Sequence, residues 1–126
     1  AGRLAEILVL NQFSRNIYRD TPQAFAQDPL ALVLAQELVV GGHDRSLPLA
    51  QRSFAYMPYM HSESLAIHAE ALRLFDQLGL ENNLAFEQRH LAILQRFGRY
   101  PHRNAALGRA ASAPEIAFLG EPGSSF

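Results

Sequence analysis

Apolar residues recur along this chain with helical spacing, and proline or glycine separates one run from the next. The first run begins at Leu4, Ile7 and Leu8 and continues to Phe13 and Ile17, as expected for one face of a helix. No stretch alternates apolar and polar residues at the spacing typical of strands. The pattern therefore predicts helices over residues 4–17, 29–40, 48–58, 63–78, 83–97 and 113–119.

Residues that favour helix ends support these boundaries. Ser62 is placed to cap the helix that ends before residue 79, and Asn82 or Asn83 is placed to cap the next one. Ser112 precedes a proline-containing first turn and is followed three residues later by Glu115, which is the pattern of a capping box. We therefore predict an all-α fold of antiparallel helix pairs, in one domain that covers residues 1–126.

Residues 54–60 and residues 43–45 have contrasting compositions, the first apolar and the second polar. Residues 54–60 are dense in aromatic and methionine side chains, which more often fill a core than line a cofactor pocket. Pro58 lies within this segment and is expected to end or kink its helix. Residues 43–45 are polar and are expected to form a solvated turn.

Two histidines lie on otherwise apolar helix faces. His90 follows Phe86 by four residues and shares a face with Ile93 and Phe97, so we expect it to be buried and hydrogen-bonded. His68 interrupts a similar apolar line, and we expect it at the partly exposed edge of that face.

The stretch Arg96–Asn104 joins two of the predicted helices and concentrates basic side chains. Gly98 is placed as the residue that ends one helix, and Pro101 as the first residue of another. Arg99 and Arg103 would then lie beside the positive end of the new helix, together with His102, and would need an anion nearby. That anion is either a bound ligand or a carboxylate of the chain, with Glu63 and Asp28 the preferred partners of the two arginines.

The first predicted helix ends in polar residues. Gln12, Arg15, Asn16 and Arg19 follow one another at the spacing of a shared helix face. This face is either a solvated helix end, or it points into a wet cleft or a buried polar network. We expect it to meet the polar residues of His61–Glu63 and of Arg99–Asn104 in space.

The same three stretches carry a resemblance to a known family. Gln12–Asn16, His61–Glu63 and Arg96–Asn104 resemble the uncharacterised bacterial family catalogued as domain of unknown function 924, as does the end of the chain, Ser112–Phe126. The resemblance covers essentially the whole chain. It implies an all-helical fold similar to tetratricopeptide-like superhelices, no established activity, and a further N-terminal helical segment in relatives that this chain lacks.

Composition narrows the classes of function. The net charge is −1, whereas a general nucleic-acid binder carries a basic excess. The absence of cysteine excludes disulfides and thiolate chemistry, and it fits a cytoplasmic protein. No apolar run reaches the roughly 18 residues that a membrane span needs. A single Glu-x-x-His pattern, Glu87 to His90, is too weak to predict a metal site, and no motif predicts a cofactor.

Two functions remain compatible with the sequence. In the first, a cleft binds or acts on a small anionic molecule, and whether it is an enzyme stays open. The candidate catalytic residues are His61, Glu63, His90 and His102, and the candidate ligand-binding residues are Gln12, Arg15, Asn16, Arg99, Arg103 and Asn104. In the second, the helices form an interaction module that holds a peptide or a partner helix.

Overall fold

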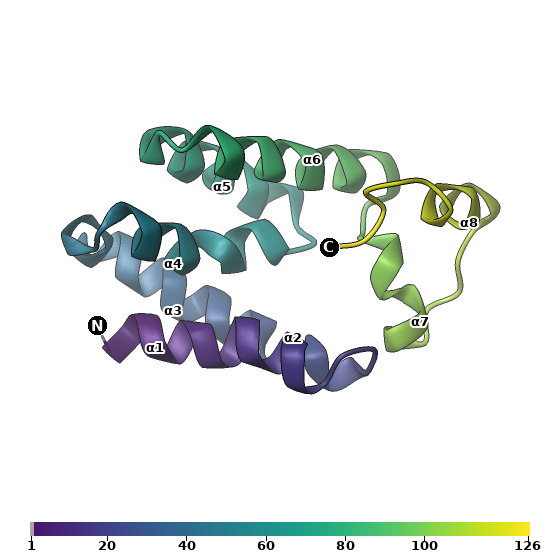
Figure 1. The fold of residues 1–126 in the computed structure, drawn as a ribbon, viewed down its shortest axis with the longest axis horizontal. Coiled ribbons are helices and arrows are strands. Elements are labelled where there is room, and N and C mark those ends of the chain that lie inside the picture. The colour runs from purple at the N-terminus through teal and green to yellow at the C-terminus, as the bar shows by residue number, and fades with distance from the viewer. Residues whose placement is uncertain (1) are drawn as a thin grey trace.

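The computed structural model describes residues 2–126, and all regular structure in this part of the chain is helical (Figure 1). The helices are α1 (Gly2–Leu8), α2 (Ser14–Ile17), α3 (Asp28–Val40), α4 (Leu49–His61), α5 (Leu65–Leu78), α6 (Glu81–Phe97), α7 (Asn104–Leu107) and α8 (Ala113–Leu119). A π-helical turn η1 (Val9–Phe13) and the 3₁₀ turns η2 (Pro22–Ala24), η3 (His43–Ser46) and η4 (Pro101–Arg103) connect them. The predicted all-α fold is confirmed.

Neighbouring helices stack on one another along most of the chain. Helix α1 packs on α3 and α4, α4 packs on α5, and α5 packs on α6. Figure 1 shows α5 and α6 as one layer at the top, with α4 and α3 beneath it and α1 at the bottom. Helices α7 and α8 lie at one end of the stack. Within residues 2–126, no helix combines the length and the apolar character needed to cross a membrane.

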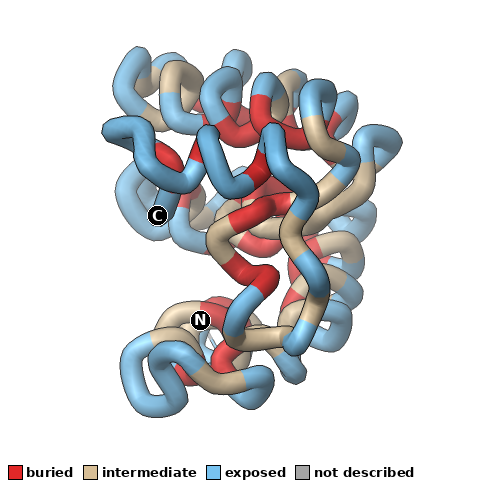
Figure 2. Tube along the Cα trace, turned by 90° about the vertical axis from the view of Figure 1, so that its right-hand side faces the viewer, coloured by how far each residue is buried: buried red, intermediate tan, exposed pale blue. Residues whose placement is uncertain are grey.

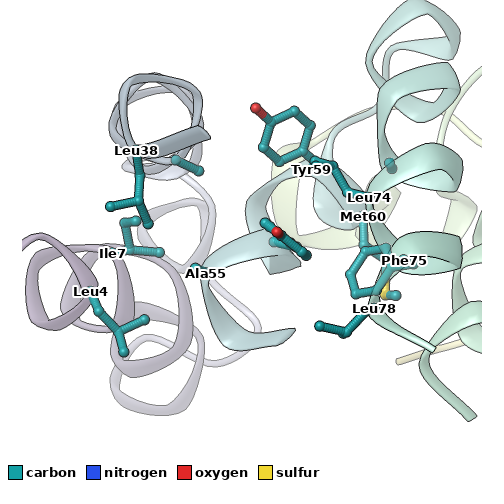
Figure 3. Packing of buried hydrophobic residues seen from close by; sticks show 12 residues of the cluster. Leu4, Ile7, Leu38, Ala55, Tyr59, Met60, Leu74, Phe75 and Leu78 are labelled. Carbon is teal, nitrogen blue, oxygen red and sulfur yellow. The ribbon is translucent and has the colours of Figure 1, made fainter. Parts of the chain in front are cut away.

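The core lies between these layers. Buried residues occupy the inward-facing turns of the helices, and the outer turns are exposed (Figure 2). Ile7 from α1, Tyr59 and Met60 from α4, and Phe75 from α5 belong to the main cluster (Figure 3). Burying a side chain such as Phe75, which is 0 % exposed, contributes about 1.5–3 kcal/mol. A second cluster joins α6 to α8 through Ile93, Leu94, Tyr100 and Phe118.

The first predicted helix is interrupted. Its middle five residues form the π-helical turn η1, and the helix ends at Ile17. Ile17 is 70 % exposed and Phe13 52 % exposed, so the expectation that both lie on a buried stripe is wrong. A π-turn contains extra backbone per turn and rotates the following side chains relative to a regular helix. The polar face expected from regular spacing is therefore broken, and Asn16 and Arg19 are exposed.

Two helix starts differ from the prediction. Helix α5 begins two residues later than expected, because the hydroxyl of Ser64, and not that of Ser62, accepts a hydrogen bond from the Ile67 backbone. Helix α6 begins at Glu81 without a side-chain cap, so neither predicted asparagine caps it. The capping box of Ser112 and Glu115 is confirmed. Gly98 ends α6 with φ +72°, a conformation that glycine adopts without strain.

Four further expectations differ from the structure. Helix α4 continues through Pro58 to His61, so the proline does not end it. Asp44 in the polar turn is buried and accepts a hydrogen bond from Tyr56, although a solvated turn was expected. Phe54, expected in the core, is half exposed. Phe86, expected on the buried face of its helix, is also half exposed.

Candidate functional site

A cleft of about 340 Å³ opens where the end of α4 meets the turn before α3 and the C-terminal segment. Its polar wall includes Asp28, His61, Glu63 and Arg103, and most of its remaining wall is apolar, including Phe25. These polar residues come from three segments that are far apart in the sequence, at residues 28, 61–63 and 103. Tertiary packing therefore creates this site, which no local motif could specify.

Arg103 is the most buried charged residue of the cleft, with 5 % of its surface exposed. Its guanidinium group lies 4.6 Å from the ring centre of Phe25 and 4.8 Å from that of Tyr100. One terminal nitrogen donates to the His61 carbonyl at 2.7 Å, and Nε has no hydrogen-bond partner within residues 2–126. Burial, together with the neighbouring positive charge of Arg15, lowers the pKa of Arg103 to about 10.

Two carboxylates lie near this guanidinium, but each is already paired with another arginine. Arg15 holds Asp28 through two hydrogen bonds of 2.9 and 2.8 Å. Arg109 holds Glu63 through two of 3.0 and 3.1 Å. Arg103 approaches both carboxylates no closer than 3.8 Å. Three guanidinium groups thus face two carboxylates, and Arg103 shares each carboxylate with an arginine that lies closer to it.

The Glu63 carboxylate is also held by the backbone of the central stretch. The Tyr100 N–H donates to it at 2.7 Å. Burial alone would raise the pKa of Glu63, but the hydrogen bonds from Arg109 and from the Tyr100 backbone outweigh burial and lower it. Glu63 is therefore an ionised group that fixes the cleft wall, which makes it a poor proton donor.

His61 is held in one orientation by Asn11. The Nδ1 atom of His61 lies 2.9 Å from the Asn11 side-chain oxygen, which also accepts a hydrogen bond from Gln12 at 2.7 Å. The amide nitrogen of Asn11 donates to Asp28 at 3.3 Å, so the amide oxygen must face the imidazole. His61 therefore carries its proton on Nδ1, and Nε2 keeps a free lone pair. Burial, followed by the charges of Arg15 and Arg103, lowers the pKa of His61 well below its ordinary value.

A second imidazole lies next to His61, and the ring of Phe126 contacts both that imidazole and a third. The His90 ring centre is 6.3 Å from that of His61, and Phe126 lies 3.8 Å from His90 and 4.3 Å from His102. His90 is buried and hydrogen-bonded to the Phe86 carbonyl at 2.7 Å, so both parts of its prediction are confirmed. Burial lowers the pKa of His90 and of His102 to about 4, so both are neutral at physiological pH.

Behind the cleft lies a buried network of hydrogen-bonded polar side chains that was not predicted from the sequence. His68 is 0 % exposed and contacts Glu87 at 2.6 Å, so its predicted place at an exposed edge is wrong. Its other ring nitrogen lies 2.7 Å from the Ser62 carbonyl and 2.8 Å from the Tyr100 hydroxyl. This network anchors Tyr100, whose backbone N–H holds the Glu63 carboxylate of the cleft. Burial raises the pKa of Glu87.

The comparisons with known proteins identify the family. Residues 1–123 match the family described as "Bacterial protein of unknown function (DUF924)". This chain is a member of the DUF924 family. It is also similar to the solved structure of a protein of unknown function, ATU0120, from Agrobacterium tumefaciens, with 39% sequence identity and a TM-score of 0.89. The match covers 94% of this chain and 66% of that chain. No curated protein matches.

In this DUF924 protein, the three predicted polar stretches do meet. Arg15 of the first stretch and Arg103 of the third lie against the same Asp28 carboxylate and the same Phe25 ring. Arg103 also donates to the His61 carbonyl, and Tyr100 donates to Glu63. Of the predicted site residues, His61, Glu63 and Arg103 line the cleft. Arg15 holds one of its carboxylates, and Gln12 supports Asn11.

His90 and His102 do not line the cleft, and three further predicted site residues lie elsewhere. Asn16 is exposed. Arg99 donates two hydrogen bonds of 2.9 Å to Glu115, and Asn104 donates a third of 2.9 Å to the same carboxylate. The expectation that Glu63 or Asp28 pairs with Arg99 is therefore wrong, whereas both lie beside Arg103. Arg99 binds α8 because Glu115 is fixed in the capping box at the start of that helix.

The helix expected to begin at Pro101 is very short. Pro101 opens only the three-residue turn η4, which leads into the four-residue α7. Such a short run of aligned peptide groups forms only a weak dipole. The anion preference of the site must therefore come from Arg103 itself. Within residues 2–126, no three His, Cys, Asp or Glu side chains are placed to hold a metal ion.

Glu87 and Arg109, two site residues that were not predicted, differ in how strongly the sequence indicates them. Glu87 lies three residues before His90, so the two share a helix face that was expected to be buried. A glutamate on such a face requires a partner, which was a usable signal. Arg109 follows the glycine after α7, and nothing in its local sequence indicates that it holds Glu63.

Proposed function

We propose that the cleft binds a small organic anion whose negative group pairs with Arg103. The observation that carries this proposal is the buried guanidinium with one hydrogen bond and no dedicated counter-ion. A buried charge is costly unless it is paired and hydrogen-bonded. Asp28 and Glu63 are each engaged by another arginine, so a ligand is the natural partner.

The size and walls of the cleft support an organic ligand. Its volume of about 340 Å³ is roughly ten times the ≈ 30 Å³ that one water occupies in the liquid, so a bare inorganic ion would leave much of it unfilled. Leu32, Pro58 and Leu107 belong to its wall, and such side chains pack well against a hydrocarbon or aromatic group. The ligand therefore combines an anionic end with an apolar body.

The variant Arg103→Met tests this proposal, because methionine keeps the apolar stem and removes the charge. Asp28 and Glu63 retain Arg15 and Arg109, so no carboxylate loses its partner and we expect the melting temperature to change by only a few degrees. Affinity for phenyl phosphate, measured by isothermal titration calorimetry, should fall at least tenfold.

The matched control is Arg19→Met, which removes the same charge at an exposed position. It should leave the affinity within about twofold, because exposed charges are screened by salt. Unchanged binding by the Arg103→Met protein would contradict the proposed function.

The alternative function, an interaction module, has one observation in its favour. An apolar groove of about 540 Å³ lies along α1, η1 and α3, and Val9 and Leu30 are about half exposed there. An amphipathic helix could lay its apolar face in such a groove. Glu6 is the single charged residue among those that line it, so the groove offers little to fix the identity of a partner. The cleft is the stronger candidate.

A further inference from the structure

Apart from Arg103 and the hydroxyl of Ser62, which can donate as well as accept, the polar side chains that line the cleft are hydrogen-bond acceptors. The carboxylates of Asp28 and Glu63 lie in its wall, and so does the imidazole of His61. A ligand that fits this wall must therefore offer hydrogen-bond donors as well as a negative charge. This requirement goes beyond charge alone and narrows the class of ligand.

The acceptor with the clearest geometry is Nε2 of His61. Its lone pair is free, because the proton of the ring is on Nδ1, where Asn11 accepts it. In the described part of the chain Nε2 makes no hydrogen bond, and it is not among the buried unpaired atoms, so it keeps contact with solvent. A donor that approaches through the cleft can reach it.

Donor and acceptor belong to residues that meet in the cleft wall. The guanidinium of Arg103 donates to the backbone carbonyl of His61 at 2.7 Å, and both residues line the cleft. One ligand group can then accept from Arg103 and donate to His61. A carboxylate has an ordinary pKa near 4 and carries no proton at neutral pH. A phosphomonoester has a second pKa of about 6 and carries both a charge and a proton there.

We propose that the cleft selects a phosphomonoester in its monoanionic, protonated form, whose P–OH donates to His61 Nε2 while its other oxygens accept from Arg103. The inference rests on the proposed function and names the class of its ligand. A sulfate ester of the same shape has no proton to donate, so an oxygen lone pair would face the imidazole lone pair. A buried acceptor left without its donor weakens binding by a factor of about ten or more.

Phenyl phosphate and phenyl sulfate provide a matched pair of probes. At pH 5.5 both are mainly monoanions, since the second pKa of a phosphomonoester is about 6. At this pH the two probes differ chiefly in that phenyl phosphate carries a P–OH proton and phenyl sulfate carries none. Calorimetric titration of the wild-type protein should give an affinity for phenyl phosphate at least tenfold above that for phenyl sulfate.

The role of His61 is tested with His61→Phe, which keeps a planar ring and removes the lone pair. We expect this variant to bind the two probes within about threefold of each other. The control is His43→Phe, an exposed histidine outside the cleft, which should keep the tenfold preference. Circular dichroism and the melting temperature establish that both variants are folded.

The wild-type protein alone provides an independent measurement. Raising the pH from 5.5 to 8 removes the second proton of phenyl phosphate and adds negative charge. If the proton is recognised, the affinity falls several-fold despite the added charge, while the affinity for phenyl sulfate stays constant. An affinity for phenyl phosphate that rises with its charge would overturn the inference.

The remaining outcomes separate this inference from the proposed function. Equal affinity of the wild-type protein for both probes overturns the selection of a protonated anion and leaves anion binding at Arg103 intact. A preference for phenyl phosphate that persists in His61→Phe removes His61 from the role. Absence of binding by both probes at millimolar concentration overturns the inference and also the proposed function for oxyanions of this size.

Discussion

Asn11 is the residue that decides which nitrogen of His61 is basic. It is 1 % exposed, and its amide is fixed by Asp28 on one side and by Gln12 and His61 on the other. A neutral amide oxygen stabilises the Nδ1–H tautomer without stabilising the charged imidazolium as a carboxylate would. His61 is therefore kept as a neutral acceptor beside two arginines.

Asn11→Asp should raise the pKa of His61. A carboxylate at this position, 2.9 Å from Nδ1 in the wild-type geometry, favours the protonated imidazole. The new charge also lies beside Asp28, and this repulsion is relieved when the imidazole takes up a proton. The rise is measured by NMR titration of the histidine side chains. Asn16→Asp adds the same charge at an exposed position and should move the His61 pKa little. A His61 pKa that is equal in both variants would argue against this account.

Individual residues also show how far the sequence predicts the site. Arg15, His61, Glu63 and Arg103 could be selected because charged and imidazole groups near helix ends seldom lie there without partners. The partner of each of these residues could not be predicted. Arg99 and Arg103 belong to the same short stretch, yet one binds the cap of α8 and the other faces the cleft. That difference depends on where α8 packs, which no local pattern encodes.

At the scale of elements, the helix ends are stabilised by specific short-range contacts. Helix α8 has only seven residues, and an isolated helix of that length does not persist in water. Its capping box and its pairing with Arg99 compensate for the short length. The pKa of Glu115 is strongly lowered, first by the hydrogen bonds from Arg99 and then by the Ser112 backbone.

Ser112→Ala should destabilise the protein by about 1 kcal/mol, because the first-turn N–H of Glu115 loses its acceptor. Ser125→Ala, at an exposed position, serves as the control and should change the stability by less than about 0.5 kcal/mol. Both are measured by urea unfolding followed by circular dichroism. Equal stability of the two variants would show that the cap contributes nothing measurable.

The elements themselves could be predicted because their signals are local. Gly98 and the Ser112 capping box each act within about one helical turn, and both were confirmed. Apolar periodicity predicted the helices, although Phe13, Ile17 and Phe86 are exposed. The π-helical turn could not be predicted, since the spacing of Leu4, Ile7 and Leu8 continues regularly through it. The turn is stabilised by tertiary contacts that hold Asn11, among them those to Asp28 and His61.

At the scale of the whole molecule, the neutral histidines make stability depend on pH. His61, His90 and His102 have folded-state pKa values below the ordinary 6.5, so the unfolded chain binds more protons as the pH falls. Their contribution to stability is present above pH 6.5 and is lost as the pH falls toward 4. Glu87, whose pKa is raised, opposes this trend with a single group.

The free energy of unfolding should therefore fall by about 2–4 kcal/mol between pH 7 and pH 5. Urea unfolding at the two values measures it. His102→Phe removes one of the three histidines and should show a smaller loss, whereas the exposed His43→Phe should show the full loss. Stability that is constant or rises over this range would contradict the assignment of neutral imidazoles.

The bonds that build the cleft join parts of the chain that are far apart. Asn11 and His61 are 50 residues apart in the sequence, His61 and Arg103 are 42 apart, and Glu63 and Arg109 are 46 apart. Each of these contacts closes a long loop, and closing it is entropically costly until the helices within it have packed. The helical hairpins, whose contacts are local, can form before any of them. The cleft is therefore completed at the end of folding, so a partly folded chain would have most of its helices and no binding site.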